Sequence, residues 1–413
     1  MPQKSTPFSD ELILELTQEL PTPFYLYSQA EIERRLDSLQ EAFAWNPGFR
    51  EYFAVKALPN PAILQIVAAR GGGADCASVP EIQLAQRAGL TGSALMFSSN
   101  NTQEAEFIAA RDAGAIINLD ALNLIPHLQR SAGIPDTISC RYSPAFEIGS
   151  ANNIMGEAGQ SKFGMTREQI FTAFAQLREL GVQHFGIHCM AASNSRVQEY
   201  WGLLSKELFT LAAEIKTRLG IDVEFLNFGG GIGIPYLPEQ QPVDVVAAGA
   251  DVRDQYQQIL EPAALTPAIF IELGRYVAGP AGVLVTRALH RKSTYKEYVG
   301  VDASAVNLLR PAMYGSYHHI TVAGKSNEPA DHTYDVVGSL CENNDKFAID
   351  RQLPKIDEGD IIVIHDAGAH GHSMGYNYNG KLRCAEYLQD DSGNVRMIRR
   401  AETPTDYFAT LDF

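Results

Sequence analysis

The chain has 413 residues and a formal net charge of −16, with 45% hydrophobic and 20% charged residues. This length exceeds that of one ordinary domain, so we expect two. The acidic balance argues against nucleic acid or an anionic membrane as a partner, because both bind basic patches. The five cysteines are widely spaced without a CxxC pair. That spacing argues against a disulfide framework or a zinc site, and for a reducing compartment.

The first residues predict an amphipathic helix that carries acids. They lack the apolar core of a signal peptide, and no apolar run is long enough to cross a bilayer. We therefore expect a cytoplasmic protein without membrane contact. Residues 24–27 (FYLY) read as a strand. Residues 30–45 predict an amphipathic helix, because their apolar residues recur every three or four positions.

From residue 52 onward, strand-like runs alternate with helical patterns. The expected strands are residues 52–55, 74–77, 94–97, 115–119, 137–142, 184–188, 223–227 and 268–272. The expected helices are residues 62–69, 80–88, 103–113, 121–131, 167–180 and 197–219. Eight strands alternating with helices predict an α/β fold of the (β/α)8 barrel type. A doubly wound open sheet is the alternative, and the lack of a G-x-G-x-x-G turn disfavours it.

The pattern changes after Pro280. Short runs rich in β-branched and aromatic residues follow, with few helical patterns between them. The runs are residues 282–292, 295–303, 333–340, 360–366, 381–388 and 394–401. They predict a second, all-β domain, which the N-terminal strand joins. The expected domains are a barrel over residues 30–279 and a β-domain made of residues 1–29 and 280–413. The barrel would then be an insertion between the two ends of the chain.

Lys56 lies in the segment EYFAVKALPNP, residues 51–61. The segment reads as a buried strand that stops before Asn60, an expected helix N-cap followed by Pro61 in the first helical position. Lys56 therefore lies near the carboxyl end of a buried strand. Such a lysine either extends its amine to solvent or uses it chemically. A lysine that forms a Schiff base needs a site that lowers its pKa, so that the amine is neutral.

In a barrel of this kind the active site is built from the carboxyl ends of the strands. The polar groups and glycines expected there are Lys56, Asp75, Ser78, Ser98, Asp120, Arg141, His188, Ser193, Gly229–Gly231, Glu272 and Arg275. Each taken alone has an ordinary structural explanation, such as a turn, an ion pair or a core histidine. Together they match pyridoxal phosphate, whose aldehyde needs an amine, whose phosphate needs close backbone N–H groups, and whose pyridine nitrogen needs a carboxylate.

The chain also resembles the fold-type III pyridoxal phosphate decarboxylases, and among them the diaminopimelate decarboxylases. The resemblance covers nearly the whole chain. It rests on FAVKALPN, GGGADCASVPEIQLA, FGGGIGIPY, ELGR, LLRPAMYGSYHHI, GSLCENNDKFAIDRQLP and HDAGAHGHSMGYNYN. It implies decarboxylation of meso-2,6-diaminopimelate to L-lysine and CO2 by a homodimer. The alternative is a sister decarboxylase that acts on D-lysine, D-ornithine, a carboxypolyamine or a siderophore precursor.

The resemblance also implies roles for individual residues. Lys56 and Cys341 would be catalytic, with Lys56 bound to the cofactor and Cys341 as a proton donor. The cofactor would contact Lys56, His188, Ser193, Gly229, Gly230, Gly231, Glu272, Gly274, Arg275 and Tyr378. The substrate would contact Arg275, Arg310, Tyr314, Glu342 and Tyr378. Cys341 and Glu342 would enter the active site of the partner subunit, and no metal is implied. A non-catalytic relative would be expected to lose such residues, and they are all present.

The chain departs from the family pattern at several positions, among them two in the run that begins at His188; the others include His370, where a tyrosine is usual. In the family, a second histidine after the strand that ends at His188 stacks on the cofactor ring. Here Met190 takes that place, and Ala192 replaces a glycine. A thioether can also pack on a ring face, so stacking in an altered form is compatible with Met190.

Overall fold

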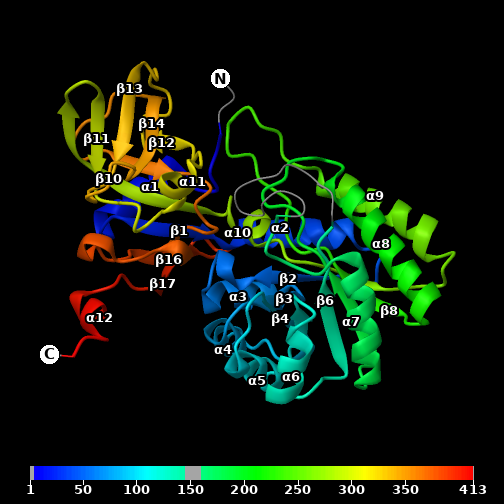
Figure 1. The fold of residues 1–413 in the computed structure, drawn as a ribbon. Helices are drawn as coiled ribbons and strands as arrows, with labels where there is room; N and C mark the ends of the chain where they lie inside the picture. The colour runs from blue at the N-terminus through cyan, green and yellow to red at the C-terminus, as the bar shows by residue number, and fades with distance from the viewer. Residues whose placement is uncertain (1–3, 145–159, 413) are drawn as a thin grey trace. The chain divides into compact units, whose positions relative to one another are not determined.

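The computed structural model describes residues 4–144 and 160–412, shown as a ribbon in Figure 1. The chain forms two compact units. The barrel unit comprises Glu33–Ile234 and Pro242–Tyr276. The sheet unit comprises the described residues of Met1–Ile32, Pro235–Gln241 and Val277–Phe413. The chain passes between the units within two helices, α2 (Gln29–Ala42) and α10 (Gly274–Ala278), and also at both ends of the segment Pro235–Gln241.

The barrel unit contains a closed parallel barrel, which eight strands form within the described residues. They are β2 (Arg50–Ala54), β3 (Gly73–Cys76), β4 (Leu95–Ser99), β5 (Ile116–Leu119), β6 (Thr137–Arg141), β7 (His184–His188), β8 (Val223–Asn227) and β9 (Ala268–Ile271). Each strand pairs with the next, and β2 pairs with β9 to close the ring. The predicted barrel is therefore confirmed, with strand ends within one or two residues of those expected.

Helix α2 precedes the first barrel strand, and helices follow most of the barrel strands. Besides α2 and α10 they are α3 (Pro61–Ala69), α4 (Val79–Arg87), α5 (Glu104–Asp112), α6 (Leu124–Ser131), α7 (Arg167–Glu179), α8 (Tyr200–Leu219) and α9 (Val245–Gln255), the last of which continues as a π-helical turn over Tyr256–Leu260. Helix α3 begins as predicted, because Asn60 Oδ1 accepts the Ala62 N–H at 3.1 Å and Pro61 occupies the first turn. Helix α9 was not predicted.

Large apolar side chains fill part of the barrel interior. Tyr52, Met96, Ile116, Phe225 and Phe270 form one buried cluster. The ring centroids of Tyr52 and Phe270 lie 4.9 Å apart in an edge-to-face arrangement, which joins the first strand to the last. The barrel thus has a packed core, and its strands carry the polar residues at their carboxyl ends.

The sheet unit is built on a nine-stranded mixed sheet among the described residues. Its strands are β1 (Phe24–Ser28), β10 (Gly282–Ser293), β11 (Glu297–Val301), β12 (Ile320–Val322), β13 (His332–Val337), β14 (Lys346–Leu353), β15 (Ile361–Ile364), β16 (Ala385–Gln389) and β17 (Val395–Arg399). Strand β1 lies between β10, to which it is antiparallel, and β16, to which it is parallel. The N-terminal strand therefore joins the C-terminal domain, as predicted.

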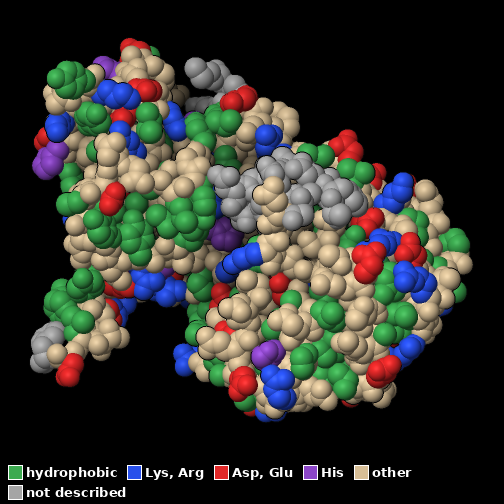
Figure 2. Space-filling view, viewed as in Figure 1, with side chains coloured by type: hydrophobic (Ala, Val, Ile, Leu, Met, Phe, Trp, Pro, Cys, Tyr) green, Lys and Arg blue, Asp and Glu red, His purple; other side chains and the backbone are tan. Residues whose placement is uncertain are grey.

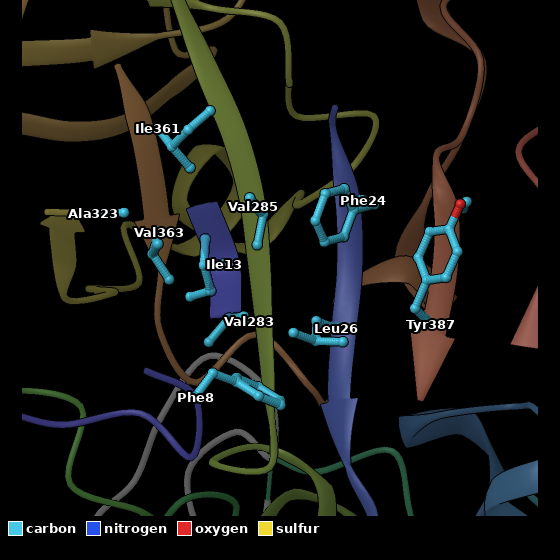
Figure 3. Packing of buried hydrophobic residues seen from close by; sticks show 11 residues of the cluster. Phe8, Ile13, Phe24, Leu26, Val283, Val285, Ala323, Ile361, Val363 and Tyr387 are labelled. Atoms are coloured by element: carbon cyan, nitrogen blue, oxygen red, sulfur yellow. The ribbon is translucent and has the colours of Figure 1, made fainter. Parts of the chain in front are cut away.

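The core of the sheet unit joins segments that are far apart in the sequence. Figure 3 shows Phe24 and Leu26 of β1 beside Val283 and Val285 of β10, with Ile13 of helix α1 (Asp10–Glu19) packed nearby. All five side chains are almost completely buried. Burial of each such side chain stabilises the fold by roughly 1.5–3 kcal/mol. The N-terminal segment is therefore an integral part of the sheet unit.

Two further short helices lie in the sheet unit, α11 (Arg310–Tyr314) and α12 (Pro404–Phe408). Among the described residues, none of the helices combines the length and the apolar character that a membrane span requires. Figure 2 shows acidic and basic side chains interspersed over the visible face of the barrel helices.

Candidate active site

Lys56 is presented by a tight turn at the end of the first barrel strand. Strand β2 ends at Ala54, and the next three residues, Val55–Ala57, form a single 3-10 turn. Gly274 lets helix α10 pack directly against this turn, because a Cβ on Gly274 would lie only 2.6 Å from the Cβ of Ala57. The turn therefore fixes the backbone of Lys56, while its side chain stays more than half exposed.

The nearest acid to the Lys56 amine is Asp75, at the end of β3. Lys56 Nζ lies 3.4 Å from Asp75 Oδ2. Loss of hydration alone would lower the pKa of Lys56, but Asp75, Glu272 and Glu81 together raise it above its usual value. The lowered pKa that was predicted for a Schiff-base lysine is therefore wrong for the protein on its own. The amine has to transfer its proton before it can attack an aldehyde.

Asp75 is a suitable acceptor for that proton. Burial, together with repulsion from Glu272, raises the pKa of Asp75 to about 7. The opposing charge of Lys56 limits the rise. A carboxyl group with such a pKa can gain or lose a proton near neutral pH, which suits a group that exchanges protons with the lysine.

Glu272, which follows β9, is held as a carboxylate. Its Oε2 lies 3.2 Å from His188 Nε2, and its Oε1 accepts a hydrogen bond from Asn227 Nδ2 at 2.7 Å. Burial would raise the pKa of Glu272, but His188, Lys56 and Asn227 lower it below its usual value. A buried, oriented carboxylate is what a protonated pyridine nitrogen requires as a partner.

The glycine turn comprises Gly229–Gly231 and follows β8. Its first N–H, that of Gly229, donates to Asn227 Oδ1 at 2.8 Å. Gly229 and Gly231 have φ angles of +61° and +114°, which favour glycine. A Cβ on Gly231 would lie 2.6 Å from the Tyr200 hydroxyl oxygen, and one on Gly230 would lie 2.8 Å from the Glu272 carbonyl oxygen. The turn is therefore a cradle, a stretch of glycine backbone whose surrounding space the Cβ of any larger residue would occupy.

Two residues important for this geometry were missed in the sequence analysis. Asn227 links the glycine turn to the Glu272 carboxylate through its two amide atoms. The side chain of Glu51 is buried, and its Oε1 accepts the Leu273 N–H at 2.8 Å. Burial raises the pKa of Glu51 well above its usual value, and Glu272 and Asp75 add repulsion. A polar side chain at the end of a strand, two residues before a glycine triplet, was the available signal for Asn227. Glu51, within a strand, gave none.

The remaining predicted barrel residues lie on nearby segments of the same unit. His188 is the last residue of β7, and Ser193 follows in the loop after it. Arg275 is buried in α10. Arg141 of β6 pairs with Asp120 at 3.2 Å. The structure thus brings Lys56, His188, the glycine turn and Glu272 to the carboxyl ends of the barrel strands.

The other predicted residues belong to the sheet unit. Arg310 is buried at the start of α11, where its Nη2 donates to Ser316 Oγ at 3.3 Å. Its guanidinium carbon lies 5.5 Å from the centroid of the Tyr314 ring. This cation–π contact orients both side chains. Arg310 and Tyr314 therefore form one local group, as their positions one helical turn apart suggest.

Glu342 and Tyr378 line a single cavity of about 470 Å³ in the sheet unit. Asp345 fixes the loop that carries Glu342, because its two carboxylate oxygens accept the N–H groups of Leu340 and Ala305 at 2.8 and 2.7 Å. Cys341 is exposed, and its N–H donates to Asn379 Oδ1 at 2.8 Å. The loop thus exposes a thiol beside a carboxylate that faces a cavity.

The barrel residues fit pyridoxal phosphate. Lys56 offers an amine, the glycine turn offers a cradle that a single Cβ would fill, and Glu272 offers a buried carboxylate. Asp75 adds a proton acceptor beside the amine, and its Oδ1 has no hydrogen-bond partner among the described residues. Such a donor set suits a cofactor that carries an aldehyde, a phosphate and a basic ring nitrogen.

Comparison with known proteins identifies the family. Residues 29–279 match the family model for the pyridoxal binding domain of pyridoxal-dependent decarboxylases. The chain belongs to the pyridoxal-dependent decarboxylases. It is therefore a carboxy-lyase that uses pyridoxal phosphate, as the sequence predicted.

Similar proteins have the same extent as this chain. Protein TabA of Pseudomonas amygdali pv. tabaci is 42% identical over 402 residues, which cover 97% of this chain and 94% of that protein. The diaminopimelate decarboxylase of Methanothermobacter thermautotrophicus is 35% identical over 395 residues, covering 95% and 92%. The crystal structure of diaminopimelate decarboxylase from Helicobacter pylori complexed with L-lysine superposes with a TM-score of 0.88, at 30% identity, and covers 96% and 98%. The predicted resemblance to diaminopimelate decarboxylases is confirmed.

Proposed function

We propose that this decarboxylase converts meso-2,6-diaminopimelate to L-lysine and CO2. The observation that carries the proposal is the similarity over nearly the full length to diaminopimelate decarboxylases, in both sequence and fold. It is supported by the retention of Arg310 and Glu342, to which the family resemblance assigns the distal carboxylate and ammonium of the substrate. L-lysine, the bound molecule in the Helicobacter pylori structure, would be the product of this reaction.

The barrel residues would hold the cofactor. Lys56 would bind its aldehyde, the glycine turn with Ser193 and Arg275 its phosphate, and Glu272 its pyridine nitrogen. When bound, pyridoxal phosphate supplies an electron sink for the pair left behind by the departing CO2. Asp75 would take the proton that Lys56 loses, because the two groups lie 3.4 Å apart.

Glu272 keeps its negative charge throughout. Its two oxygens are oriented by His188 and Asn227. A carboxylate that is already oriented and desolvated needs no reorganisation when positive charge arrives at a ring nitrogen. This pre-organisation is one contribution that the barrel would make to the chemistry.

Residues of the sheet unit would recognise the far end of the substrate. An arginine can bind a carboxylate through two parallel hydrogen bonds, and Arg310 is buried and oriented by Tyr314 and Ser316. Glu342 faces a cavity and would bind an ammonium group. A substrate that lacks the distal carboxylate would not form these hydrogen bonds to Arg310, at a cost of roughly 1–3 kcal/mol.

We also propose a homodimer in which Cys341 and Glu342 serve the active site of the partner subunit, with Cys341 as the proton donor. The exposure of Cys341 in the single chain supports this assignment. An exposed thiol on an ordered loop is available to another chain. The Asn379 and Asp345 contacts fix that loop in advance.

The second candidate is a sister decarboxylase with another amino-acid substrate, such as D-lysine, D-ornithine, a carboxypolyamine or a siderophore precursor. The observation in its favour is the 42% identity to TabA, which exceeds the 35% identity to the Methanothermobacter thermautotrophicus enzyme. A second observation in its favour is Met190, which stands where the family has a ring-stacking histidine.

Substitutions of the distal-end residues test the proposal. In Arg310→Met and Glu342→Gln, we expect KM for meso-diaminopimelate to rise roughly tenfold or more, because a charged partner is lost in each. Met313→Leu, at another residue that lines the Glu342 cavity, is the control for packing changes. If KM stays constant in both variants while a different amino acid is the better substrate, the sister decarboxylase is the correct reading.

A further inference from the structure

Met190 occupies a position in the barrel unit that its place in the sequence does not reveal. It lies in the loop after β7 and is partly exposed. Its sulfur accepts the N–H of Gly230 at an N–S distance of 3.1 Å. The preceding N–H of the glycine turn, that of Gly229, is already donated to Asn227 Oδ1. Met190 thus occupies a backbone donor in the middle of the turn.

The thioether covers the glycine turn as well as accepting from it. A Cβ on Gly229 would lie 3.1 Å from Met190 Sδ, and a Cβ on Gly230 would lie 3.5 Å from Met190 Cε. A group that approached the Gly230 N–H would therefore meet the methionine first. The side chain can give way, because methionine is unbranched, flexible and here partly exposed.

Sulfur is a much weaker hydrogen-bond acceptor than a phosphate oxygen. A thioether carries no charge and accepts weakly, whereas a bond from a backbone N–H to an anionic oxygen is shorter and roughly twice as strong as a neutral one. The Gly230 N–H would therefore exchange its sulfur partner for a phosphate oxygen with a net gain. Part of the interaction energy is used to separate the sulfur from the N–H.

We propose that Met190 is a positioning residue that occupies the Gly230 N–H while the glycine turn is empty and releases it to the cofactor phosphate. The inference rests on the proposed assignment of the glycine turn to that phosphate. It implies that Met190 lowers the affinity of the turn for phosphate and keeps its backbone donor satisfied until the cofactor arrives.

The substitution Met190→Leu separates the acceptor from the bulk of the side chain. Leucine is apolar and of similar volume but cannot accept a hydrogen bond, so the Gly230 N–H loses its partner in the empty protein. We expect the dissociation constants of inorganic phosphate and of pyridoxal phosphate to fall roughly threefold to tenfold. The affinity for pyridoxal, which lacks the phosphate, should not change.

Binding is measured on the full-length protein by the absorbance of the cofactor, with inorganic phosphate as a competitor. Met96→Leu is the matched control, because Met96 is buried in the barrel core away from the glycine turn. As an independent readout, the 13C-labelled methyl group of Met190 should change its NMR frequency when inorganic phosphate saturates the wild-type protein, and that of Met96 should not.

The outcomes separate the inference from the assignment on which it rests. Tighter phosphate binding in Met190→Leu together with the methyl shift supports the inference. If phosphate binds the wild type but Met190→Leu binds it equally or more weakly, Met190 does not compete with phosphate and the inference is overturned. If neither phosphate nor pyridoxal phosphate affects the Met190 methyl group, the glycine turn is not the phosphate site, and both fail.

Discussion

The Lys56–Asp75 pair decides the protonation state of the reactive amine. The position of Lys56 at a strand end was evident in the sequence, because a buried strand is followed closely by Asn60–Pro61, which signals the start of a helix. The direction of the pKa shift of Lys56 was not evident, because it depends on Asp75 in β3, Glu272 after β9 and Glu81 in α4. Sequence patterns predict where each strand ends, one strand at a time. A pKa depends on the distances between charged side chains on different strands, which these patterns do not give.

The pair predicts a pH dependence for attachment of the cofactor. The amine reacts only when neutral, and its pKa is raised, so the rate of attachment should increase as the pH rises. In Asp75→Asn the pKa of Lys56 should fall, because a stabilising negative charge is lost. The midpoint of the rate–pH profile should then move to lower pH.

Stopped-flow absorbance measures this profile. Asp112→Asn is the control, because exposed Asp112 pairs with Arg111 rather than with a group near Lys56. A profile that keeps its position or moves to higher pH in Asp75→Asn would show that the charge of Asp75 does not govern the pKa of the amine.

Glu272 gives a second prediction at the scale of one residue. Glu272→Gln keeps the shape but loses the charge that faces the ring nitrogen, so kcat for CO2 release should fall on the order of 100-fold. Glu224→Gln removes a carboxylate from another Glu–His pair on neighbouring strands, at an N–O distance of 2.8 Å, and should have little effect. Equal losses of kcat in the two variants, with normal cofactor content, would contradict the assignment of Glu272.

At the scale of elements, the glycine turn shows what backbone conformation contributes. Gly231 is restricted twice, by a φ of +114° and by the Tyr200 side chain, whose hydroxyl oxygen would lie 2.6 Å from a Cβ. Gly220, at the end of α8, also has a positive φ, +67°, but its Cβ would meet open space. An alanine at Gly220 would therefore be destabilised only by its backbone conformation, whereas an alanine at Gly231 would also overlap with a neighbouring side chain.

Gly231→Ala should accordingly lower the free energy of unfolding more than Gly220→Ala does. Gly220→Ala carries only the conformational cost, about 1 kcal/mol. Gly231→Ala adds an overlap with Tyr200, so we expect a loss of about 3 kcal/mol and a large loss of cofactor affinity. Denaturant titration of the protein without cofactor measures the free energy of unfolding. The absorbance of the cofactor measures its affinity. Equal losses at both positions would mean that the turn relaxes around the added methyl group.

The elements themselves could be predicted to different degrees. The barrel strands are short apolar runs with clear stops, and they were found to within a few residues. Strands β12 and β14 of the sheet unit were missed. Strand β12 has only three residues, and β14, which reads KFAIDRQL, mixes charged and apolar residues without a clean alternation. Their pairing partners β15 and β13 determine them, and sequence patterns do not contain such pairing.

At the scale of the whole molecule, both ends of the chain form one unit. Strand β1 contacts β10 and β16 along its whole length, and its residues are all buried. Leu26→Ala should therefore lower the free energy of unfolding of the sheet unit by about 2–5 kcal/mol. Leu203→Ala, at an exposed leucine of α8, should have little effect in the same denaturant titration. A negligible loss for Leu26→Ala would show that β1 is dispensable to the sheet unit.

The proposed homodimer with shared sites gives a prediction on assembly. Lys56→Ala and Cys341→Ala should each be nearly inactive alone. After the two are mixed, unfolded and refolded together, activity should partly return, because one site of each mixed dimer has both residues intact. The Lys56→Ala/Cys341→Ala double variant, treated in the same way, should stay inactive. Mixed dimers without recovered activity would place both residues in the same chain's site.

The measurement that tests the central claim most directly is product analysis with purified protein and pyridoxal phosphate. With meso-diaminopimelate we predict equal amounts of CO2 and L-lysine, and a higher kcat/KM than with D-lysine, D-ornithine or a carboxypolyamine. The reaction should require Lys56 and be absent in Lys56→Ala. CO2 release from one of the other amino acids, with none from meso-diaminopimelate, would contradict the proposed substrate while leaving the family assignment intact.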